Sequence, residues 1–598
     1  MPHLHFRSAG LLLLALLLVL CGPAAAVNQA TKQFHALLAD HWQWQSREFP
    51  EQATFNGNNR YNDRLTDASA AAVVRRKLAQ TEFLARLKRI DARQLATQDQ
   101  VSYAVFAAER TQQARLNAIY GKLPFGAEDG WLPVSQMHGP HLDLAELAKA
   151  SPFNSVADYE AYLKRLAALP TAIDQVIERM RQGMASGWMP PAIAIQRVPR
   201  QIAAHLDADA RKSPAYRPFE KFPAQFSSEE RLQLAENGRR VIVGAVTPAF
   251  EKLKAFVEEK YLPAARQQLS ASTLPGGGAY YQLMIAQHTT TTMGAREIHE
   301  IGLSEVARIN AAMETEIRRS GFQGSRAEFI KYINTDPRFL FTRPEDMLTV
   351  YRDIAKRADA ELSRLFAELP RLPYGIRAME AYEGDNAEHY TPGNSESGRA
   401  GYFEANVLNL KRRSMPSMQA LLLHEAVPGH HLQIARQQEI KGLPAFRRFG
   451  WFTAFGEGWA LYAESLGTEM GFYQDPYSKF GQLSMEMHRA CRLVIDTGLH
   501  AFGWSREHAI AYLETNAALS NEFATAEVDR YIVWPGQALS YKIGELRIKA
   551  LRAKAQTALG ARFDLRRFHN AVIDNGVLPL DVLEQQIDRW IAAEQQGS

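Results

Sequence analysis

Apolar residues recur every three to four positions through most of this chain, and this spacing constrains its fold more than any other feature. Such a period collects apolar side chains on one face of an α-helix, and that face must pack against other helices. Local signals mark two helix starts: Ser227 with Glu230 forms a capping box, and Thr342 with Glu345 forms another around Pro344. We therefore predict a large, mainly α fold.

The composition excludes several classes of protein. With 46% hydrophobic and 22% charged residues in a chain of 598, the protein is too apolar to be disordered. The formal net charge is only +4 and no run of five or six like charges occurs, so nothing indicates binding to nucleic acid.

The first 26 residues have the pattern of a secretory signal peptide. Arg7 precedes the apolar run Leu11–Leu20, and a series of alanines ends at Ala26. The run is about half of the ~20 residues that span a bilayer, and no later segment approaches that length, so we expect no transmembrane segment in the mature chain. The sequence predicts an exported protein, periplasmic or extracellular.

The two cysteines bear on processing and stability. Lipidation of Cys21 is the alternative to cleavage after Ala26, and we favour cleavage because Leu20 is bulky where lipoprotein processing requires a small residue. After cleavage Cys491 is the only cysteine, so no intramolecular disulfide can form. We expect Cys491 to be a small buried hydrophobic residue in a helix.

Glycine and proline mark the predicted domain boundary. Residues 272–281, STLPGGGAYY, interrupt two long helical regions and are typical of a flexible connector. They separate an N-terminal helical region, 27–271, from a C-terminal helical region, 279–598, which we expect to carry the chemistry.

Residues 372–408 are the exception to the helical pattern. The stretches YGIRAMEAY and GYFEANVLNL alternate around a turn-rich segment, which predicts a short β-hairpin or a small sheet. A free strand edge could pair with an extended peptide, with Arg399 and Asn406 directed toward that ligand. The alternative, which we favour slightly, is a structural sheet with solvated polar residues.

Four ionisable residues lie close together in the otherwise apolar, helix-like stretch MQALLLHEAVPGHHLQIARQQE: His424, Glu425, His430 and His431. Buried polar groups need partners, and clustered imidazoles with a carboxylate suit Zn²⁺. The usual His-Glu-x-x-His spacing is absent, because the next histidine comes six residues after His424, about 120° away around an ideal helix.

We therefore expect the helix to be distorted between these histidines. Pro428 cannot donate to the carbonyl of His424, and Gly429 relaxes the backbone, so a bulge can absorb the extra residues and bring in His430 as second ligand. His431 returns to the face of His424 but lies about 10.5 Å along the axis, too far for two bonds of about 2.0–2.1 Å to one ion.

A third ligand is expected from a neighbouring helix. Glu457 lies 33 residues after His424, which allows a helix, a turn at Gly442 and Pro444, and a return helix. Glu464, seven residues later on roughly the same face, either orients a ligand histidine or is a solvated charge.

Two histidines and one carboxylate leave the fourth position of a tetrahedral ion open for water, which indicates catalysis and not a closed structural site. Glu425 is the predicted general base that takes the proton of that water. For the oxyanion of a tetrahedral intermediate we expect Tyr541 as donor, with Arg530 and His500 behind it.

The blocks HEAVPGHHLQ, EGWALYAE, RLVIDTGLHAFGWS and RYIVWPGQALSYKIGELR, in this order, resemble the domain of unknown function 885 family (DUF885) over most of the mature chain. The resemblance implies a relation to zinc metallopeptidases with mostly helical, cleft-bearing folds, similar to thermophilic carboxypeptidases and oligoendopeptidases. Their His-Glu-x-Gly-His-x-Leu pattern is similar to residues 424–432 and favours His430 over His431 as the ligand. Their Glu-Gly-Phe-Ala is similar to residues 457–460 and supports Glu457.

Together these features predict an exported, zinc-dependent metallopeptidase that hydrolyses peptide or related amide bonds in a metallopeptidase-like helical fold around a deep cleft. Two alternatives stay open: a catalytically inactive peptide-binding protein of the same fold, and a hydrolase of non-peptide amides or esters.

Overall fold

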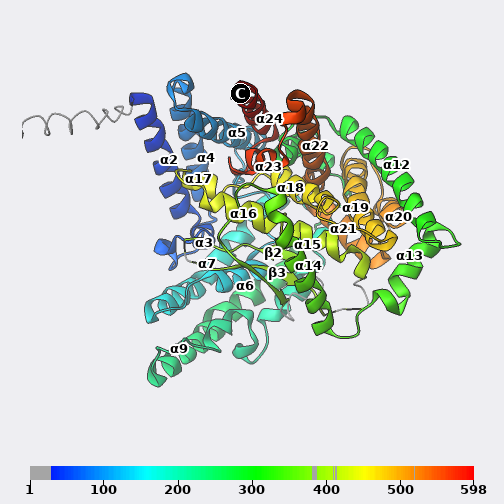
Figure 1. Ribbon diagram of the computed structural model, residues 1–598. Helices are drawn as coiled ribbons and strands as arrows, with labels where there is room; N and C mark the ends of the chain where they lie inside the picture. The colour runs from blue at the N-terminus through cyan, green and yellow to red at the C-terminus, as the bar shows by residue number, and fades with distance from the viewer. Residues whose placement is uncertain are drawn as a thin grey trace, which may run out of the picture.

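The computed structural model describes residues 28–379, 387–396, 398–408, 410, 414–517 and 519–597. The predicted signal peptide, residues 1–26 with Cys21, lies outside these residues. The described chain is mainly helical, as its apolar periodicity predicts, and its small sheet lies in the middle of the molecule, between the N-terminal helices and the helices that follow residue 476 (Figure 1).

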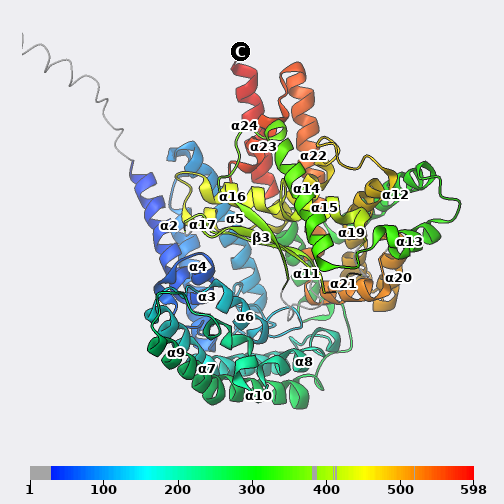
Figure 2. The same ribbon diagram turned by 60° about the horizontal axis from the view of Figure 1, so that its bottom comes forward.

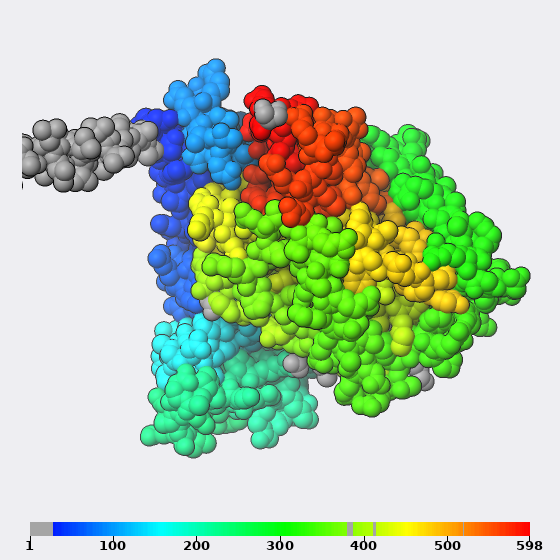
Figure 3. All heavy atoms as spheres, in the orientation of Figure 1, coloured from blue at the N-terminus to red at the C-terminus, as the bar shows by residue number. Residues whose placement is uncertain are grey.

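The helices of the N-terminal region form two neighbouring groups. Helices α2 to α5 make one edge of the molecule, and α6 to α10 make the cyan and teal lobe below them (Figure 3). Their bounds are α2 Gln29–Glu48, α3 Pro50–Phe55, α4 Ala70–Lys88, α5 Thr97–Tyr120, α6 Pro140–Ala150, α7 Val156–Ser186, α8 Val198–Ile202, α9 Ser228–Val241 and α10 Thr247–Phe256.

The helices after residue 276 surround the sheet and continue to the C-terminus, where α22 and α24 run side by side (Figure 2). Their bounds are α11 Gly277–Thr289, α12 Ala295–Arg319, α13 Arg326–Thr335, α14 Pro344–Leu365, α15 Met418–Glu425, α16 His430–Glu439, α17 Ala445–Arg448, α18 Thr453–Leu466, α19 Pro476–Ala501, α20 Arg506–Ala517, α21 Asn521–Val533, α22 Ser540–Leu559, α23 Leu565–Ile573 and α24 Leu580–Gln596.

The sheet of the described residues has the strand order β1-β3-β2, with β1 Tyr374–Ala378, β2 His389–Thr391 and β3 Gly401–Ala405. β1 and β3 pair in parallel, whereas β2 pairs antiparallel with β3. The small sheet predicted within 372–408 is therefore confirmed, but a hairpin of the two predicted stretches is wrong. Alternation indicates a strand but not its direction, and parallel neighbours need a longer connection than a hairpin turn.

Three hydrophobic clusters fill the described part of the chain. The largest combines residues of α2, α4 and α5 with residues of α15, α16 and α18, so these first helices share a core with the segment that carries the histidines. The second is formed by residues between 134 and 261 together with Val533. The third is formed mainly by α12, α13 and α19 to α21. The largest cluster thus draws on both sides of the segment 272–281.

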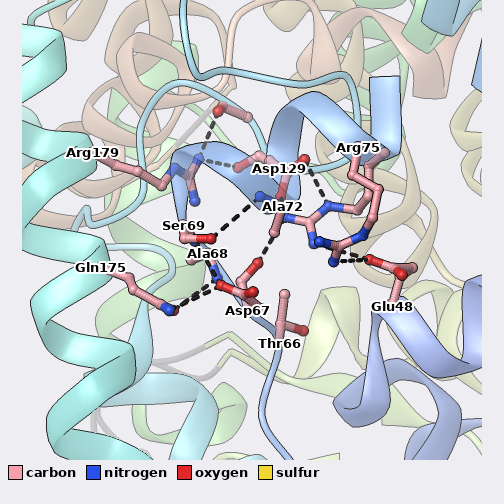
Figure 4. A network of polar contacts seen from close by, with 12 residues as sticks. Glu48, Thr66, Asp67, Ala68, Ser69, Ala72, Arg75, Asp129, Gln175 and Arg179 are labelled. Carbon is pink, nitrogen blue, oxygen red and sulfur yellow. Dashed lines mark hydrogen bonds and ion pairs between the residues drawn. The ribbon is translucent and has the colours of Figure 1, made fainter. Parts of the chain in front are cut away.

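A polar network joins α2, α4 and α7 at the first part of the chain (Figure 4). Arg75 pairs with Glu48 at 2.9 Å, and Gln175 of α7 donates to Asp67 at 2.9 Å. The amide of Ala68 in turn donates to Gln175. These contacts fix the loop before α4 against α7, so the N-terminal helices are held by polar contacts as well as by their core.

The local predictions have mixed outcomes. Ser227 and Glu230 make the predicted capping box, and Cys491 is buried. The cap at Thr342 is wrong, because α14 starts at Pro344 with Arg343 at its N-cap and no side-chain cap bond. None of the helices in the described residues combines the length and the apolar character needed to cross a bilayer.

Helices α18 and α22 cross at two glycines. A side chain at Gly458 would begin 2.5 Å from the backbone of Gly544, and one at Gly544 would overlap the carbonyl of Ala454. Only hydrogen side chains let two helices approach this closely. The crossing places Glu457, next to Gly458, in the same layer as Tyr541, one turn before Gly544.

We predict that Gly458→Ala lowers the free energy of unfolding by about 1–3 kcal/mol, because the added methyl forces the two helices apart. Differential scanning calorimetry of the variant and the parent measures this. Gly244→Ala is the matched control: that position is helical with open space around it, so its stability should stay the same or rise by up to about 1 kcal/mol. Equal stability of Gly458→Ala and the parent would contradict the role of this crossing.

Candidate metal centre

The helix that carries the histidines is broken, not merely bulged. α15 ends at Glu425, the chain passes through a cis Val427–Pro428 peptide, and α16 starts at His430. A side chain at Gly429 would overlap the carbonyls of Leu423 and His424, so only glycine allows the chain to fold back onto the end of α15. The break therefore brings His430 close to His424, as the expected bulge was to do.

Two contacts hold the break in place. The indole Nε1 of Trp459 on α18 donates to the carbonyl of Pro428 at 2.9 Å, and the amide of His431 donates to the carbonyl of Ala426 at 3.1 Å. As a result the rings of His424 and His430 lie 4.9 Å apart and at 88° to each other. The helix break thus brings the two imidazoles together although they are six residues apart.

The carboxylate of Glu457 completes a group of three potential metal ligands. One ligand atom each from His424, His430 and Glu457 lies within 4.8 Å of the other two. Glu457 Oε2 is 3.6 Å from His424 Nε2 and 3.4 Å from His430 Nε2. These are longer than ordinary hydrogen bonds.

The distances and the chemistry of these donors fit Zn²⁺. Bonds of about 2.0–2.2 Å in a tetrahedral arrangement separate neighbouring ligand atoms by roughly 3.3–3.6 Å. The two separations from Glu457, 3.4 and 3.6 Å, fall in this range. Two imidazoles and one carboxylate are a ligand set of catalytic zinc sites.

Glu464 orients the first of these histidines. Its buried Oε1 lies 2.8 Å from Nδ1 of His424 and 3.8 Å from Nη2 of Arg489. Because Glu464 accepts the Nδ1 proton of His424, the Nε2 atom is the one that faces Glu457, which is the usual support for a metal-binding histidine. Of the two predicted roles for Glu464, the structure therefore excludes the solvated charge.

The charges around the site favour a cation. Burial by itself lowers the pKa of His424, but the carboxylates of Glu457, Glu464 and Glu425 raise it to about 10. Burial would raise the pKa of Glu457, yet its contacts with His424 and His430 hold that pKa well below its usual range. Three carboxylates thus meet two imidazoles and Arg489, an excess of negative charge that a divalent ion would balance.

Glu425 is held by the sheet. The backbone amide of Tyr390, in the edge strand β2, donates to Glu425 Oε2 at 2.8 Å. The hydroxyl of the same tyrosine lies 2.9 Å from Nδ1 of His431. Burial lowers the pKa of His431 to about 4, and its ring packs 4.7 Å from that of Tyr374. His431 therefore faces the sheet, away from the three ligand atoms.

Sequence reasoning did not find Tyr390. Its contribution to Glu425 is a backbone N–H, which no side-chain pattern reports, and the three-residue strand β2 is too short to show alternation. The sheet therefore positions Glu425, the predicted general base, and nothing in the sequence of the strands indicates this role.

Tyr541 and Arg530 lie together beside the ligands. The ring of Tyr541 is 6.4 Å from that of His424 and nearly parallel to it. Its hydroxyl accepts from Nη2 of Arg530 at 3.2 Å and from Gln537 at 3.4 Å, so its own proton remains available. The guanidinium of Arg492 lies 4.4 Å from the centre of the tyrosine ring.

His500 does not belong to this group. Its Nδ1 accepts from the amide of Ala271 at 3.0 Å and its Nε2 lies 2.9 Å from the carbonyl of Tyr531, so both ring nitrogens are used by the backbone. The ring is fully buried, and burial lowers its pKa to about 4. The prediction of His500 as a donor to an oxyanion is wrong; it joins the chain at residue 271 to α19 and α21.

Arg399 and Asn406 lie at the ends of the segment around β3. Arg399 pairs through its backbone with Asn394 and is exposed, whereas Asn406 is buried and accepts from the amide of Leu408 at 3.1 Å. Asn406 is therefore part of a local turn, while a ligand contact of Arg399 stays a prediction.

Comparison with known proteins places the chain. A family profile described as "Bacterial protein of unknown function (DUF885)" matches residues 50–587. The crystal structure of a "putative lipoprotein" from Colwellia psychrerythraea is similar, with 27% sequence identity and a TM-score of 0.88 over 94% of this chain and 100% of that one. A "putative lipoprotein of unknown function" from Shewanella oneidensis shares the fold, with 18% identity and a TM-score of 0.68 over 93% and 99%. No curated protein matches the sequence.

We predict that His430→Ala weakens zinc binding by more than the roughly 10–100-fold typical of losing a residue that only supports a ligand. His431→Ala is the matched control, and it should bind zinc like the parent because that ring faces Tyr390. Competition of each purified variant against a chromogenic zinc chelator measures the affinity. A larger loss in His431→Ala than in His430→Ala would show that the ligands are assigned to the wrong histidine.

Proposed function

The chain belongs to the DUF885 family of bacterial proteins of unknown function, and for this member we propose zinc-dependent hydrolysis of peptide or related amide bonds. The observation that carries the proposal is the convergence of His424, His430 and Glu457 beside a held carboxylate, Glu425. Three protein ligands leave a tetrahedral ion one position for water, which distinguishes a catalytic zinc site from a structural one.

A bound Zn²⁺ would lower the pKa of a water molecule toward about 7 and polarise the scissile carbonyl. Glu425 is the general base in this proposal. The amide of Tyr390 occupies Oε2 of Glu425 and fixes the direction of the carboxylate, so Oε1 can accept the proton of a water and pass it to the leaving amine.

Tyr541 and Arg530 would stabilise the negative charge that develops on the carbonyl oxygen. Because the tyrosine hydroxyl accepts from Arg530, its O–H is polarised and can donate to that oxygen. The glycine crossing of α18 and α22 keeps this donor in register with Glu457. Such preorganised donors need no rearrangement during the reaction.

We also propose that the protein is exported. The signal-peptide pattern of residues 1–26 supports this, and the similar protein from Colwellia psychrerythraea is described as a "putative lipoprotein". A peptidase outside the cytoplasm would act on peptides of the periplasm or of the medium.

We predict that Glu425→Gln lowers the rate of peptide hydrolysis by about 10²–10⁴-fold, because the amide cannot take a proton from water. The zinc content should stay at the parent level, since Glu425 is not a proposed ligand. The assay follows cleavage of a mixture of quenched-fluorescent peptides, with elemental analysis of the same samples. In the parent, a chelator should abolish cleavage and zinc should restore it.

Two results would contradict this proposal. If the zinc-loaded parent cleaves neither peptides nor amides nor esters, the protein is a binding protein and not a hydrolase. If Glu425→Gln cleaves as fast as the parent, another group supplies the base.

We predict that Tyr541→Phe lowers kcat by about 10²–10³-fold with little change in KM, because the lost donor acts on charge that develops only in the transition state. Steady-state kinetics on one cleaved peptide separates the two constants. Tyr462→Phe is the matched control, since that buried hydroxyl bonds to His569 and Arg552 instead. A rise in KM with kcat unchanged would assign Tyr541 to substrate binding alone.

A further inference from the structure

Two tryptophans next to the candidate metal centre leave much of their surface to solvent. Trp451 is 41% exposed and Trp534 is 46% exposed. An indole is costly to leave in water, and exposed aromatic side chains beside a polar site often bind a ligand. Neither residue is needed to build the metal centre, so their exposure calls for an explanation.

Trp451 lies against the second ligand histidine. Its ring centre is 5.9 Å from that of His430, and a side chain at Gly456 would overlap its six-membered ring. The glycine therefore lets the indole lie flat on the start of α18, directly before Glu457. One edge of the metal centre is thus bordered by an aromatic surface.

Trp534 follows α21, the helix that carries Arg530. Its amide donates to the carbonyl of Arg530, whose side chain holds the hydroxyl of Tyr541. Two residues later, Gly536 packs against the backbone of Met284 on α11. The backbone at Trp534 is therefore fixed relative to α21 and α11.

His288 links Trp534 to the start of α18, which lies close to Trp451 in the sequence. Its ring meets that of Trp534 edge to face at 6.1 Å, and its Nδ1 lies 3.4 Å from Oγ1 of Thr453. Thr453 is the first residue of α18, two positions after Trp451 and four before Glu457. Burial lowers the pKa of His288 to about 4, so the ring beside Trp534 carries no charge at neutral pH.

We propose that Trp451 and Trp534 form the recognition surface of the proposed hydrolase and select substrates with a large apolar or aromatic side chain next to the scissile bond. This inference rests on the function proposed above. The chemistry fits because both indoles offer flat apolar faces and the buried histidine beside Trp534 is neutral. An apolar substrate side chain that packs on the two indoles loses its contact with water, and the neighbouring carbonyl would then lie beside the metal position.

Two small zinc-binding compounds test the proposal without knowledge of the natural substrate. Phenylalanine hydroxamate and glycine hydroxamate carry the same metal-binding group and differ only in the side chain. Isothermal titration of the zinc-loaded protein should show phenylalanine hydroxamate binding about ten- to a hundredfold more tightly. Trp451→Ala and Trp534→Ala should each remove most of that preference and leave the affinity for glycine hydroxamate unchanged.

Control variants separate recognition from damage to the fold. Trp451→Phe and Trp534→Phe keep an aromatic ring and should retain most of the preference. Phe502→Ala removes an aromatic residue of similar exposure, 38%, that packs on His299 elsewhere, and it should bind both compounds like the parent.

The outcomes distinguish the two proposals. If neither hydroxamate binds the zinc-loaded parent, the metal centre is wrong and this inference falls with it. If both bind equally well, or if the alanine variants keep the preference for phenylalanine hydroxamate, the metal centre stands and the tryptophans do not select the substrate. Loss of both compounds to the same degree in the alanine variants, with the phenylalanine variants equally affected, also overturns the inference.

Discussion

The close approach of Gly429 to the last carbonyls of α15 is the contact on which the rest of the site depends. Two imidazoles six residues apart cannot meet on a straight helix. The break at residues 426–429 folds the second helix back, and Trp459 fixes it from α18. Without that close backbone contact His424 and His430 would lie on different faces, and no third ligand could unite them.

A second set of contacts orients the side chains around the three candidate ligands. Glu464 sets the tautomer of His424, the edge strand holds Glu425 through the amide of Tyr390, and Arg530 polarises Tyr541. These contacts come from α18, the sheet and α21, so the site is assembled where three distant parts of the chain meet. The shared hydrophobic core of the first helices and α15 to α18 keeps those parts together.

The sequence predicted what depends on local spacing and missed what depends on long-range contacts. The helical fold follows from apolar periodicity, and the clustering of His424, His430 and Glu457 follows from residue type and from the helix break that Pro428 and Gly429 allow. The parallel pairing of β1 with β3 did not, because alternation carries no direction. The sequence offered His500 as a candidate oxyanion donor, yet its partners are backbone atoms some 30 and 230 residues away.

The central claim is that three side chains converge to hold one divalent ion. Crystals soaked in zinc and measured on both sides of the zinc absorption edge test it most directly. The account predicts one strong anomalous peak within about 2.0–2.2 Å of Nε2 of His424, Nε2 of His430 and a carboxylate oxygen of Glu457. Full zinc occupancy elsewhere with no peak among these three atoms would contradict it.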